Sequence, residues 1–411
     1  MPHCDTGQDV QHIGGEMQVF TKSFTQQESL PEDAIEKMTS MLRHGRLHRY
    51  NTAPDEISET SILESEYAAW QGSKYCVATT SGGQAIQLAL RVCGVSPGDK
   101  VLANAYTLAP VPGAIHAVGA QAVLIEIDHH YHISLSHLEE MAQSTDAKVL
   151  LLSHMRGHIA DMEAILQIAE KYQLKIIEDC AHTMGASWQG IRSGNFGHVA
   201  AFSTQTYKHI NSGEGGFLTT NDDEMAARAI IHSGSYMLYE RHGTLPPEEV
   251  FDRVKLECAN FSCRLDNLRA ALIRSQLPCL ENNISRWNAL YTVLSDKLAQ
   301  TDGIEVPIRK QGEAFVGSSI QFRPAALDKA DIPDFLSRCA SRGVELKWFG
   351  ADAPAAFTSR YDSWKYLEDI PDLPHTRQAL EKTVDMRIPL TFTPKDCEQI
   401  ASIIADEVSR G

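Results

Sequence analysis

An acidic pair at the end of an apolar run is the first feature that could carry chemistry. The run KII at 175–177 leads directly into Glu178–His182, with the sequence EDCAH. A carboxylate that projects from a buried strand end is costly in free energy unless it meets a positive charge. The protonated ring nitrogen of a bound pyridine cofactor would supply that charge, and Asp179 would keep the ring able to withdraw electrons. A helix N-cap or a buried ion pair would also satisfy this carboxylate, so both interpretations stay open.

Lys208 is the second candidate, because it lies in a polar, glycine-rich stretch between two apolar segments. This stretch reads STQTYKHINSGEGG from Ser203 to Gly216. Loops of such composition are more often functional than structural. A lysine becomes a useful amine nucleophile when partial burial and neighbouring cations lower its pKa. The adjacent His209 is compatible with that role, and a solvated surface charge is the alternative.

Two glycines after the apolar run KYCVATT form the third candidate. Glycines at Gly82 and Gly83, followed by Gln84, allow backbone amides to approach a phosphate at a helix N-terminus. Ordinary turns use the same residues. The chain contains no GxxxxGK[ST] motif and no GxGxxG motif after a strand, which disfavours a P-loop and a standard dinucleotide fold.

Metal binding and cysteine chemistry are disfavoured by spacing. The run DHHYH at 128–132 matches no common zinc motif and has no partner cluster of Cys or His nearby, so we expect a structural loop and no metal site. The nine cysteines contain no CxxC pair, and several lie in apolar runs, where a thiol behaves as a small hydrophobe. Cys180 is interpreted as filling space beside Asp179. This usage predicts a reducing, cytoplasmic location.

The segments that must position these residues alternate between strand-like and helix-like patterns. Apolar runs at 101–105, 122–128, 148–154 and 175–181 alternate with helix-like stretches at 109–119, 134–144 and 162–174. This alternation predicts an α/β fold whose mostly parallel central sheet has helices on both faces. Ligands collect beyond the carboxyl ends of such strands, so the polar residues that follow each strand are expected to line a site. They are 80–84, 104–107, Asp128, 153–154 and 178–182.

The second half of the chain predicts a connector and a smaller domain. Helical periodicity is strong from about Asn260 and is interrupted at Pro278. The later segments SSIQFRP, DIPDFLSRCASRG and PKDCEQIASIIADEV predict a strand, a helix and a terminal helix. With 411 residues, two domains are expected. We predict a flexible tail at 1–20, a large domain at 21–270, and a connector helix with a small α/β domain at 271–411.

Composition excludes several classes of partner. The 37 basic and 53 acidic residues give a formal charge of −16, which repels phosphate backbones and anionic membranes. No continuously apolar window is long enough to span a bilayer, and the first fifteen residues are polar, without the apolar segment of a signal peptide. We therefore expect neither a nucleic-acid partner nor a membrane association.

Several segments, taken in order, resemble one known family. ATTSGGQAIQLAL, HMRGHIADMEAI, IIEDCAHTMGA, AFSTQTYKHINSGEGGFLTT and ANFSCRLDNLRAALIRSQL are similar to the DegT/DnrJ/EryC1/StrS family of pyridoxal-phosphate (PLP)-dependent sugar aminotransferases. The similarity runs from about Phe20 to the final helix, and EDCAH followed by SxxxxKxxxxGEGG is its most specific part. The resemblance implies the aspartate-aminotransferase fold, PLP-dependent transferase fold type I, with PLP as the cofactor.

The resemblance also implies a role for each candidate residue. Lys208 would hold the cofactor as a Schiff base and then move the proton, Asp179 would pair with the pyridine nitrogen, and His182 would neighbour the phenolic oxygen. The phosphate would be bound by Ser203 and by backbone groups of Gly82, Gly83 and Gln84. Asn260 would reach the phosphate of the neighbouring subunit, which implies a homodimer with its active sites at the interface.

Three departures from the family pattern concern the cofactor and the substrate. Family members commonly have SGT where this chain has Ser81-Gly82-Gly83, which removes a hydroxyl group. The aromatic residue that usually stacks on the cofactor ring is replaced by Leu108, so either an aliphatic contact replaces the stack or Tyr106 has taken the role. KWFGADAP stands where many relatives carry a histidine-containing segment.

The expected reaction is transamination in amino sugar biosynthesis. An amino acid, expected to be glutamate, would donate its amino group to a keto group on a sugar, nucleotide-sugar, sugar-acid or cyclitol acceptor. The alternatives are a sugar dehydratase on the same scaffold, a non-catalytic regulator, and a sugar-nucleotide-binding module without cofactor. Dehydratases of this family carry histidine in place of the lysine, so Lys208 favours transamination. The charged residues that would recognise the acceptor are expected on the surface by default; they are Arg156, Arg241, Arg264, Arg323 and Lys347. Of these, Arg156 follows the strand end at 153–154, where a pocket should lie, so it could either line that pocket or brace a neighbouring strand.

Overall fold

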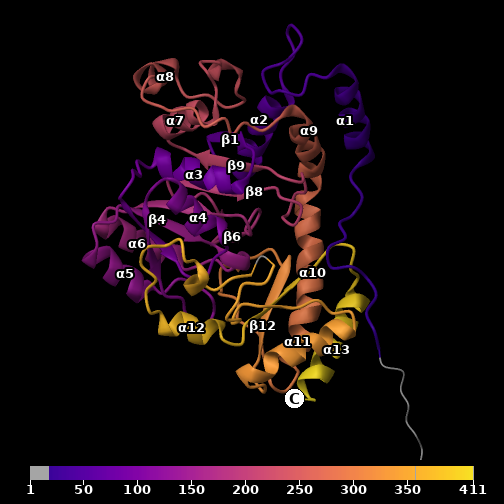
Figure 1. The fold of residues 1–411 in the computed structure, drawn as a ribbon. Coiled ribbons are helices and arrows are strands. Elements are labelled where there is room, and N and C mark those ends of the chain that lie inside the picture. The colour runs from indigo at the N-terminus through magenta and orange to yellow at the C-terminus, as the bar shows by residue number, and fades with distance from the viewer. Residues whose placement is uncertain (1–17, 357, 411) are drawn as a thin grey trace, which may run out of the picture.

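The computed structural model describes residues 18–356 and 358–410 and contains two main sheets (Figure 1). The large sheet has seven strands in the order β1-β9-β8-β5-β4-β2-β3. Its strands are β1 (Tyr75–Thr79), β2 (Lys100–Asn104), β3 (Gln121–Ile125), β4 (Val149–Ser153), β5 (Lys175–Asp179), β8 (Val199–Ser203) and β9 (Gly216–Thr220). A three-stranded sheet is formed by β6 (Ser187–Trp188), β7 (Ile191–Arg192) and β11 (Glu313–Ala314).

The predicted mostly parallel sheet is confirmed. Strands β3, β2, β4, β5 and β8 run parallel, whereas β9 lies antiparallel between β8 and β1. Ser153 is paired with Asp179 in register, so the carboxyl ends of β4 and β5 meet at one edge. The glycine-rich stretch between β8 and β9 turns back at this same edge, which positions Lys208 there.

Alternate residues of each central strand enter two separate cores. Leu150 and Ile176 pack in one core, and Leu151 and Ile177 pack in the other. This alternation buries both faces of the sheet and confirms the predicted helices on both sides. One face is covered by α2 (Glu59–Gln71), α5 (Leu135–Ser144), α6 (Met162–Tyr172) and α9 (Asn267–Gln276). The other is covered by α3 (Gly82–Val92), α4 (Pro110–Ala117), α7 (Asp223–Ser233) and α8 (Glu248–Val254).

A long helical connector leads to the small sheet. Helix α9 begins at Asn267, later than the periodicity at Asn260 indicated, because Asp266 caps it by accepting the N–H of Arg269. A 3₁₀ turn at Leu277–Cys279 contains Pro278, as predicted, and α10 (Leu280–Ala299) continues the path (Figure 1). None of the described helices combines the length and the apolar composition that a bilayer span requires.

The predicted elements of the C-terminal part are present. The strand SSIQFRP is β12 (Ser319–Pro324), the helix DIPDFLSRCASRG contains α11 (Ile332–Ser341), and the terminal helix is α13 (Pro394–Val408). The small sheet has the order β10-β12-β14-β13. Its other strands and the remaining helix are β10 (Ile304–Glu305), β13 (Lys347–Trp348), β14 (Val384–Arg387) and α12 (Pro374–Leu380). The domain boundaries at 20 and 270 stay a prediction.

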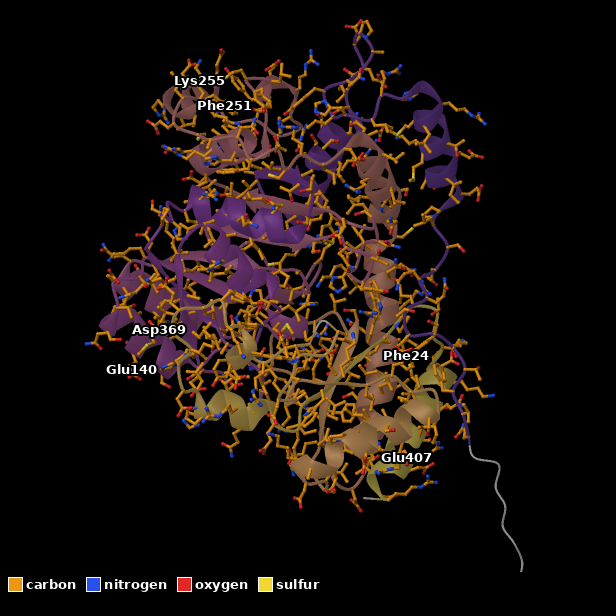
Figure 2. All side chains as sticks on the ribbon, in the orientation of Figure 1. Phe24, Glu140, Phe251, Lys255, Asp369 and Glu407 are labelled. Carbon is orange, nitrogen blue, oxygen red and sulfur yellow. The ribbon has the colours of Figure 1, made fainter. Side chains whose placement is uncertain are left out.

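The N-terminal segment packs against the C-terminal elements before α1 (Glu32–His44) begins. Of the tail predicted at 1–20, residues 1–17 lie outside the described residues. Phe20 is buried, and its ring meets those of Phe24 and Phe392 edge to face, at centroid distances of 5.6 and 5.1 Å. The ring of Phe24, labelled in Figure 2, also meets that of Phe392 edge to face, just before α13 begins. The segment therefore belongs to the folded body from about Phe20 onward.

Candidate active site

Six of the predicted site residues meet in one cavity of about 80 Å³ at the carboxyl edge of the large sheet. Each comes from the end of a strand or the start of the following loop or helix, as expected for a parallel sheet. They are Gly82, Gly83, Asp179, His182, Ser203 and Lys208; Leu108, Ser153 and Met155 are among the other lining residues. Gln84 and Asn260 do not line this cavity.

The two glycines form the first turn of α3. A side chain at Gly82 would place its Cβ 2.8 Å from Cβ of Ser203, so only glycine allows the helix to approach β8 this closely. A Cβ at Gly83 would meet nothing nearer than Ser81 Oγ at 3.8 Å. Ser81 caps the helix by accepting the N–H of Gln84, so the amide of Gln84 is already bonded. The cavity is thus bordered by the amides of a helix N-terminus and by the Ser203 side chain.

Asp179 supplies a carboxylate to the same cavity that the glycines border. Its Oδ2 accepts a 2.8 Å hydrogen bond from Ser153, and its Oδ1 accepts the N–H of Ala181 at 3.2 Å. Thr107 in turn donates to Ser153 at 2.8 Å. These donors are neutral and hold the carboxylate in place without cancelling its charge. Neither a helix N-cap nor an ion pair at Asp179 is present among the described residues.

Lys208 faces His182 across the cavity, with 2.8 Å between Nζ and Nε2. Burial, and then the nearby guanidinium of Arg156, lower the pKa of Lys208 to about 7, against the opposing charge of Asp179. Burial, together with the charge of Lys208, holds the pKa of His182 well below its usual range. A neutral imidazole therefore stands beside an amine that loses its proton near neutral pH, which is the state in which lysine acts as a nucleophile and base.

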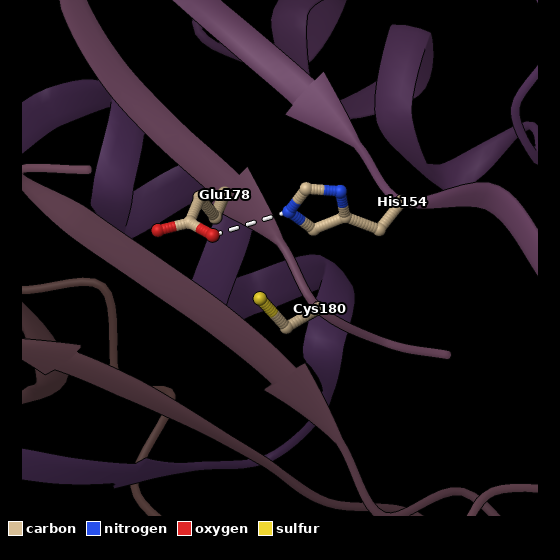
Figure 3. Close-up of side chains that lie close together, drawn as sticks. All are labelled: His154, Glu178 and Cys180. Atoms are coloured by element: carbon tan, nitrogen blue, oxygen red, sulfur yellow. Dashed lines mark hydrogen bonds and ion pairs between the residues drawn. The ribbon is translucent and has the colours of Figure 1, made fainter. Parts of the chain in front are cut away.

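The other face of β5 carries a buried polar cluster (Figure 3). His154, Glu178 and Cys180 place one potential ligand atom each within 4.8 Å of one another. Glu178, however, accepts hydrogen bonds from His154 Nε2 at 3.1 Å and from three backbone N–H groups of the loop 194–197. These bonds hold the pKa of Glu178 below its usual range despite burial, and burial raises the pKa of the Cys180 thiol. The cluster therefore fastens the loop 194–197 to the strand.

Leu108, and not Tyr106, is the side chain that covers the cavity. Leu108 lines it, whereas the ring of Tyr106 packs against Tyr131 and Phe349, with centroid distances of 5.4 and 5.0 Å. Of the two possibilities for the missing aromatic stack, the structure thus places the aliphatic side chain at the site.

Residues 29–405 match the sequence model of the DegT/DnrJ/EryC1/StrS aminotransferase family. The chain belongs to this family. It is 34% identical, over 254 residues that cover 61% of this chain and 63% of the relative, to the dTDP-3-amino-3,4,6-trideoxy-α-D-glucose transaminase of Streptomyces venezuelae. It is 31% identical, over 239 residues that cover 58% of this chain and 61% of the relative, to the GDP-perosamine synthase of Caulobacter vibrioides.

A solved structure confirms the fold of the family. The crystal structure of S. venezuelae DesV in complex with a ketimine intermediate is 26% identical and covers 92% of this chain and 95% of its own, with a TM-score of 0.77. The predicted fold class, that of fold type I aminotransferases, is therefore confirmed. The chain spans about three fifths of the length of the curated relatives that it matches.

Arg156 lies inside the protein and not on the surface, where sequence reasoning had placed it by default. Its side chain is 11% exposed and its Nη2 donates to Asp385 Oδ2 at 2.8 Å. It approaches Lys208 from β4, which is why its charge lowers the pKa of that lysine. Arg387 was missed altogether. Together with Lys208 it lines a second cavity of about 330 Å³, and its only sequence signal is the polar alternation of VDMR in β14.

Asn260 does not line the cavity of its own chain. Its Oδ1 accepts hydrogen bonds from the backbone N–H and the hydroxyl of Ser262, at 2.9 and 3.1 Å. We call residues 236–261 the exposed segment. Within it, large apolar side chains are exposed to solvent, with Leu256 at 89%; the others are Tyr236, Met237, Leu245 and Phe261.

Proposed function

We propose that this protein is a PLP-dependent aminotransferase. It would move an amino group, expected to come from glutamate, to a keto group on a sugar, nucleotide-sugar, sugar-acid or cyclitol acceptor. One observation carries the proposal: the amine of Lys208, with its pKa near 7, lines the same cavity as the carboxylate of Asp179 and the glycine N-terminus of α3. The similarity to sugar transaminases supports the reaction class.

The residues at the cavity fit PLP. The amides of Gly82 and Gly83 and the hydroxyl of Ser203 form a cradle for a phosphate, because a helix N-terminus attracts anions. The carboxylate of Asp179 accepts hydrogen bonds from the neutral groups Ser153 and Ala181 N–H, which do not cancel its charge. That charge can therefore pair with a protonated ring nitrogen. Leu108 supplies an apolar contact for a ring. Phosphate, ring nitrogen and reactive carbonyl thus each meet a suitable group.

When bound, PLP supplies a carbonyl group that condenses with amines and a ring that withdraws electrons from the reacting carbon. Lys208 would hold the cofactor through Nζ; once the substrate amine has displaced Nζ and left it free, Lys208 would take up and return the substrate proton there. His182 stays neutral and hydrogen-bonds Nζ, which orients the amine. Ser153 and the N–H of Ala181 fix the orientation of Asp179.

The absorption spectrum of the purified protein tests this proposal. We expect a yellow protein, or one that PLP turns yellow, whose absorption band changes when glutamate is added. Lys208→Ala should abolish the lysine-dependent band, whereas Lys382→Ala should leave it unchanged, because Lys382 contacts the carbonyl of Ala325 and lines neither cavity. A colourless wild type that PLP cannot reconstitute refutes the proposal. A yellow protein that no amino donor bleaches favours a non-catalytic regulator.

We also infer that the active unit is a homodimer in which Asn260 completes the phosphate site of the other subunit. The large apolar side chains of the exposed segment support burial against a second copy. Mixing inactive Lys208→Ala and Asn260→Ala variants tests this. Heterodimers should contain one intact site, so an equal mixture that exchanges subunits should regain about a quarter of the wild-type activity. Mixtures that stay inactive, or a monomer in analytical ultracentrifugation, contradict it.

A cytoplasmic location completes the proposal. The eight cysteines that the structure describes all have free thiols, and six of them are buried. Free buried thiols fit a reducing compartment. Fractionation of cells that produce the protein would test this, and recovery of the protein outside the cytoplasmic fraction would contradict it.

A further inference from the structure

One face of the small sheet is polar where it meets the active site. In β14, alternate residues point to opposite faces, so Asp385 and Arg387 share one face while their neighbours enter the core. Cross-strand register places further polar side chains on this same face. They are Gln321 opposite Asp385, Ser319 opposite Arg387, and Lys347 opposite Asp385.

Arg387 carries a positive charge that no carboxylate balances within the described part of the chain. It is half-buried and lines the cavity of about 330 Å³ that Lys208 also lines. Its guanidinium lies over the ring of Tyr207, 3.7 Å from the centroid. Because Tyr207 precedes Lys208 in the chain, this contact holds the guanidinium close to the reactive amine. Burial, and then the charge of Arg156, lower the pKa of Arg387.

The nearest buried carboxylate is already committed to other donors. Asp385 accepts Arg156 Nη2 on Oδ2 and Gln321 Nε2 on Oδ1, each at 2.8 Å. Lys347 adds a further half-buried cation. Burial lowers the pKa of Lys347, and the charge of Asp385 opposes this effect. The other acid that influences both cations, Glu345, is exposed. Arg387 thus borders the cavity with its charge unpaired, and Lys347 adds a second positive charge on the same face of the sheet, in a protein whose overall charge is −16.

Such an excess is costly to bury unless a ligand supplies the opposite charge. The planar fork of an arginine matches a carboxylate through two parallel hydrogen bonds. We infer that Arg387 forms a carboxylate-binding subsite, supported by the charge of Lys347 on the same face of the sheet, and that this subsite holds the substrate while its reacting carbon lies at Lys208. The inference rests on the proposed aminotransferase function. The carboxylate belongs either to the amino-acid donor or to a sugar-acid acceptor.

Equilibrium binding of glutarate tests the subsite without catalysis. Glutarate has two carboxylates but neither an amine nor a keto group, so it binds without reacting. We expect isothermal titration calorimetry on the PLP-loaded protein to show a dissociation constant that rises about 10- to 100-fold in Arg387→Gln. Lys347→Gln should weaken binding less, and Arg387→Lys should recover part of the affinity. Arg323→Gln is the matched control, because Arg323 lies in β12 and is paired with Glu305.

Two further measurements separate this inference from a folding defect and from the proposed function. The variants should keep the wild-type melting temperature and cofactor absorption. Glutarate affinity that is equal in wild type and Arg387→Gln overturns the subsite, as does tighter binding of inorganic phosphate or of the neutral glutaramide. If the protein takes up no PLP, but Arg387→Gln still weakens glutarate binding, the proposed function is refuted and the subsite is supported.

Kinetics of the two half-reactions identify which substrate carries the carboxylate. A rise in the KM for glutamate in Arg387→Gln assigns the subsite to the donor. A rise in KM only for acceptors that carry a carboxylate, and not for their neutral analogues, assigns it to the acceptor. Unchanged KM values in both half-reactions overturn the inference.

Discussion

The pH dependence of Lys208 reactivity follows directly from its surroundings and can be measured without the cofactor reaction. Its pKa is lowered to about 7, first by burial and then by Arg156, with Arg387 adding to the effect and Asp179 opposing it. At pH 7 about half of the Lys208 side chains are therefore neutral amines. An ordinary lysine, with a pKa of about 10.4, is neutral in roughly one molecule in 2,500 at this pH. The neutral fraction of Lys208 thus exceeds the ordinary one by a factor on the order of 10³.

Competitive labelling of the cofactor-free protein with acetic anhydride, read by mass spectrometry, measures this fraction residue by residue. The labelling rate of Lys208 should rise with pH to a midpoint near 7 and then level off. Lys171 provides an internal control, because its hydrogen bond to Glu139 raises its pKa. Its labelling should still be rising at pH 10. Asp179→Asn should move the Lys208 midpoint downward, since the charge of Asp179 supports the protonated amine.

A Lys208 midpoint close to that of Lys171 would refute this reasoning. Poor access of the reagent would lower the plateau for Lys208 but would leave its midpoint in place. The midpoint therefore reports on the electrostatics of the site and not on its openness.

Two substitutions test how the site is built. Gly82→Ala places a Cβ against Ser203 and should destabilise the fold by about 1–3 kcal/mol and weaken PLP binding, whereas Gly113→Ala, also in a helix but with open space around it, should be neutral or slightly stabilising. Equal melting temperatures for the two variants would contradict the packing argument. Glu178→Gln places an amide against N–H donors and should lower the free energy of unfolding at pH 7, measured with denaturant, by about 3–5 kcal/mol. Glu163→Gln is the control and should lower it by about 1 kcal/mol, because Glu163 accepts one indole N–H. Because the pKa of Glu178 is depressed in the folded protein, its contribution exists above the unfolded pKa and is lost as pH falls through the folded value. The unfolding free energies of the wild type and Glu178→Gln should therefore converge in acid. A difference between them that is constant with pH would contradict this.

The site residues that could be predicted from the sequence are those whose positions depend on short, local sequence patterns. Alternating apolar runs predict the parallel sheet, and in such a sheet the residues after each strand meet at one edge. Asp179 and Ser203 directly end strands, so their convergence with the glycines at 82–83 followed from topology. Lys208 was found because the loop that carries it has a distinctive composition.

The parts that were missed depend on contacts between distant segments. The place of Arg156 after a strand end indicated a pocket residue or a brace, but nothing near it in sequence indicates its partner Asp385, which lies 229 positions later. Arg387 ends a short alternating strand, and four residues are too few to distinguish a strand from a turn. The amide of Gln84 was expected to be available, but the serine that precedes the glycines captures it, which local capping rules could have indicated.

The carboxylate subsite and the proton chemistry of Lys208 are coupled by the same charges. Arg156 and Arg387 lower the pKa of Lys208 in the structure, so an anion bound at Arg387 cancels part of this repulsion. Substrate binding should then raise the pKa of Lys208 and make its amine a better proton acceptor when the substrate proton must be removed. Repeating the labelling experiment with saturating glutarate should move the Lys208 midpoint upward in wild type and leave it in place in Arg387→Gln. An unchanged wild-type midpoint at saturation would show that the anion binds too far from Lys208 to act on it.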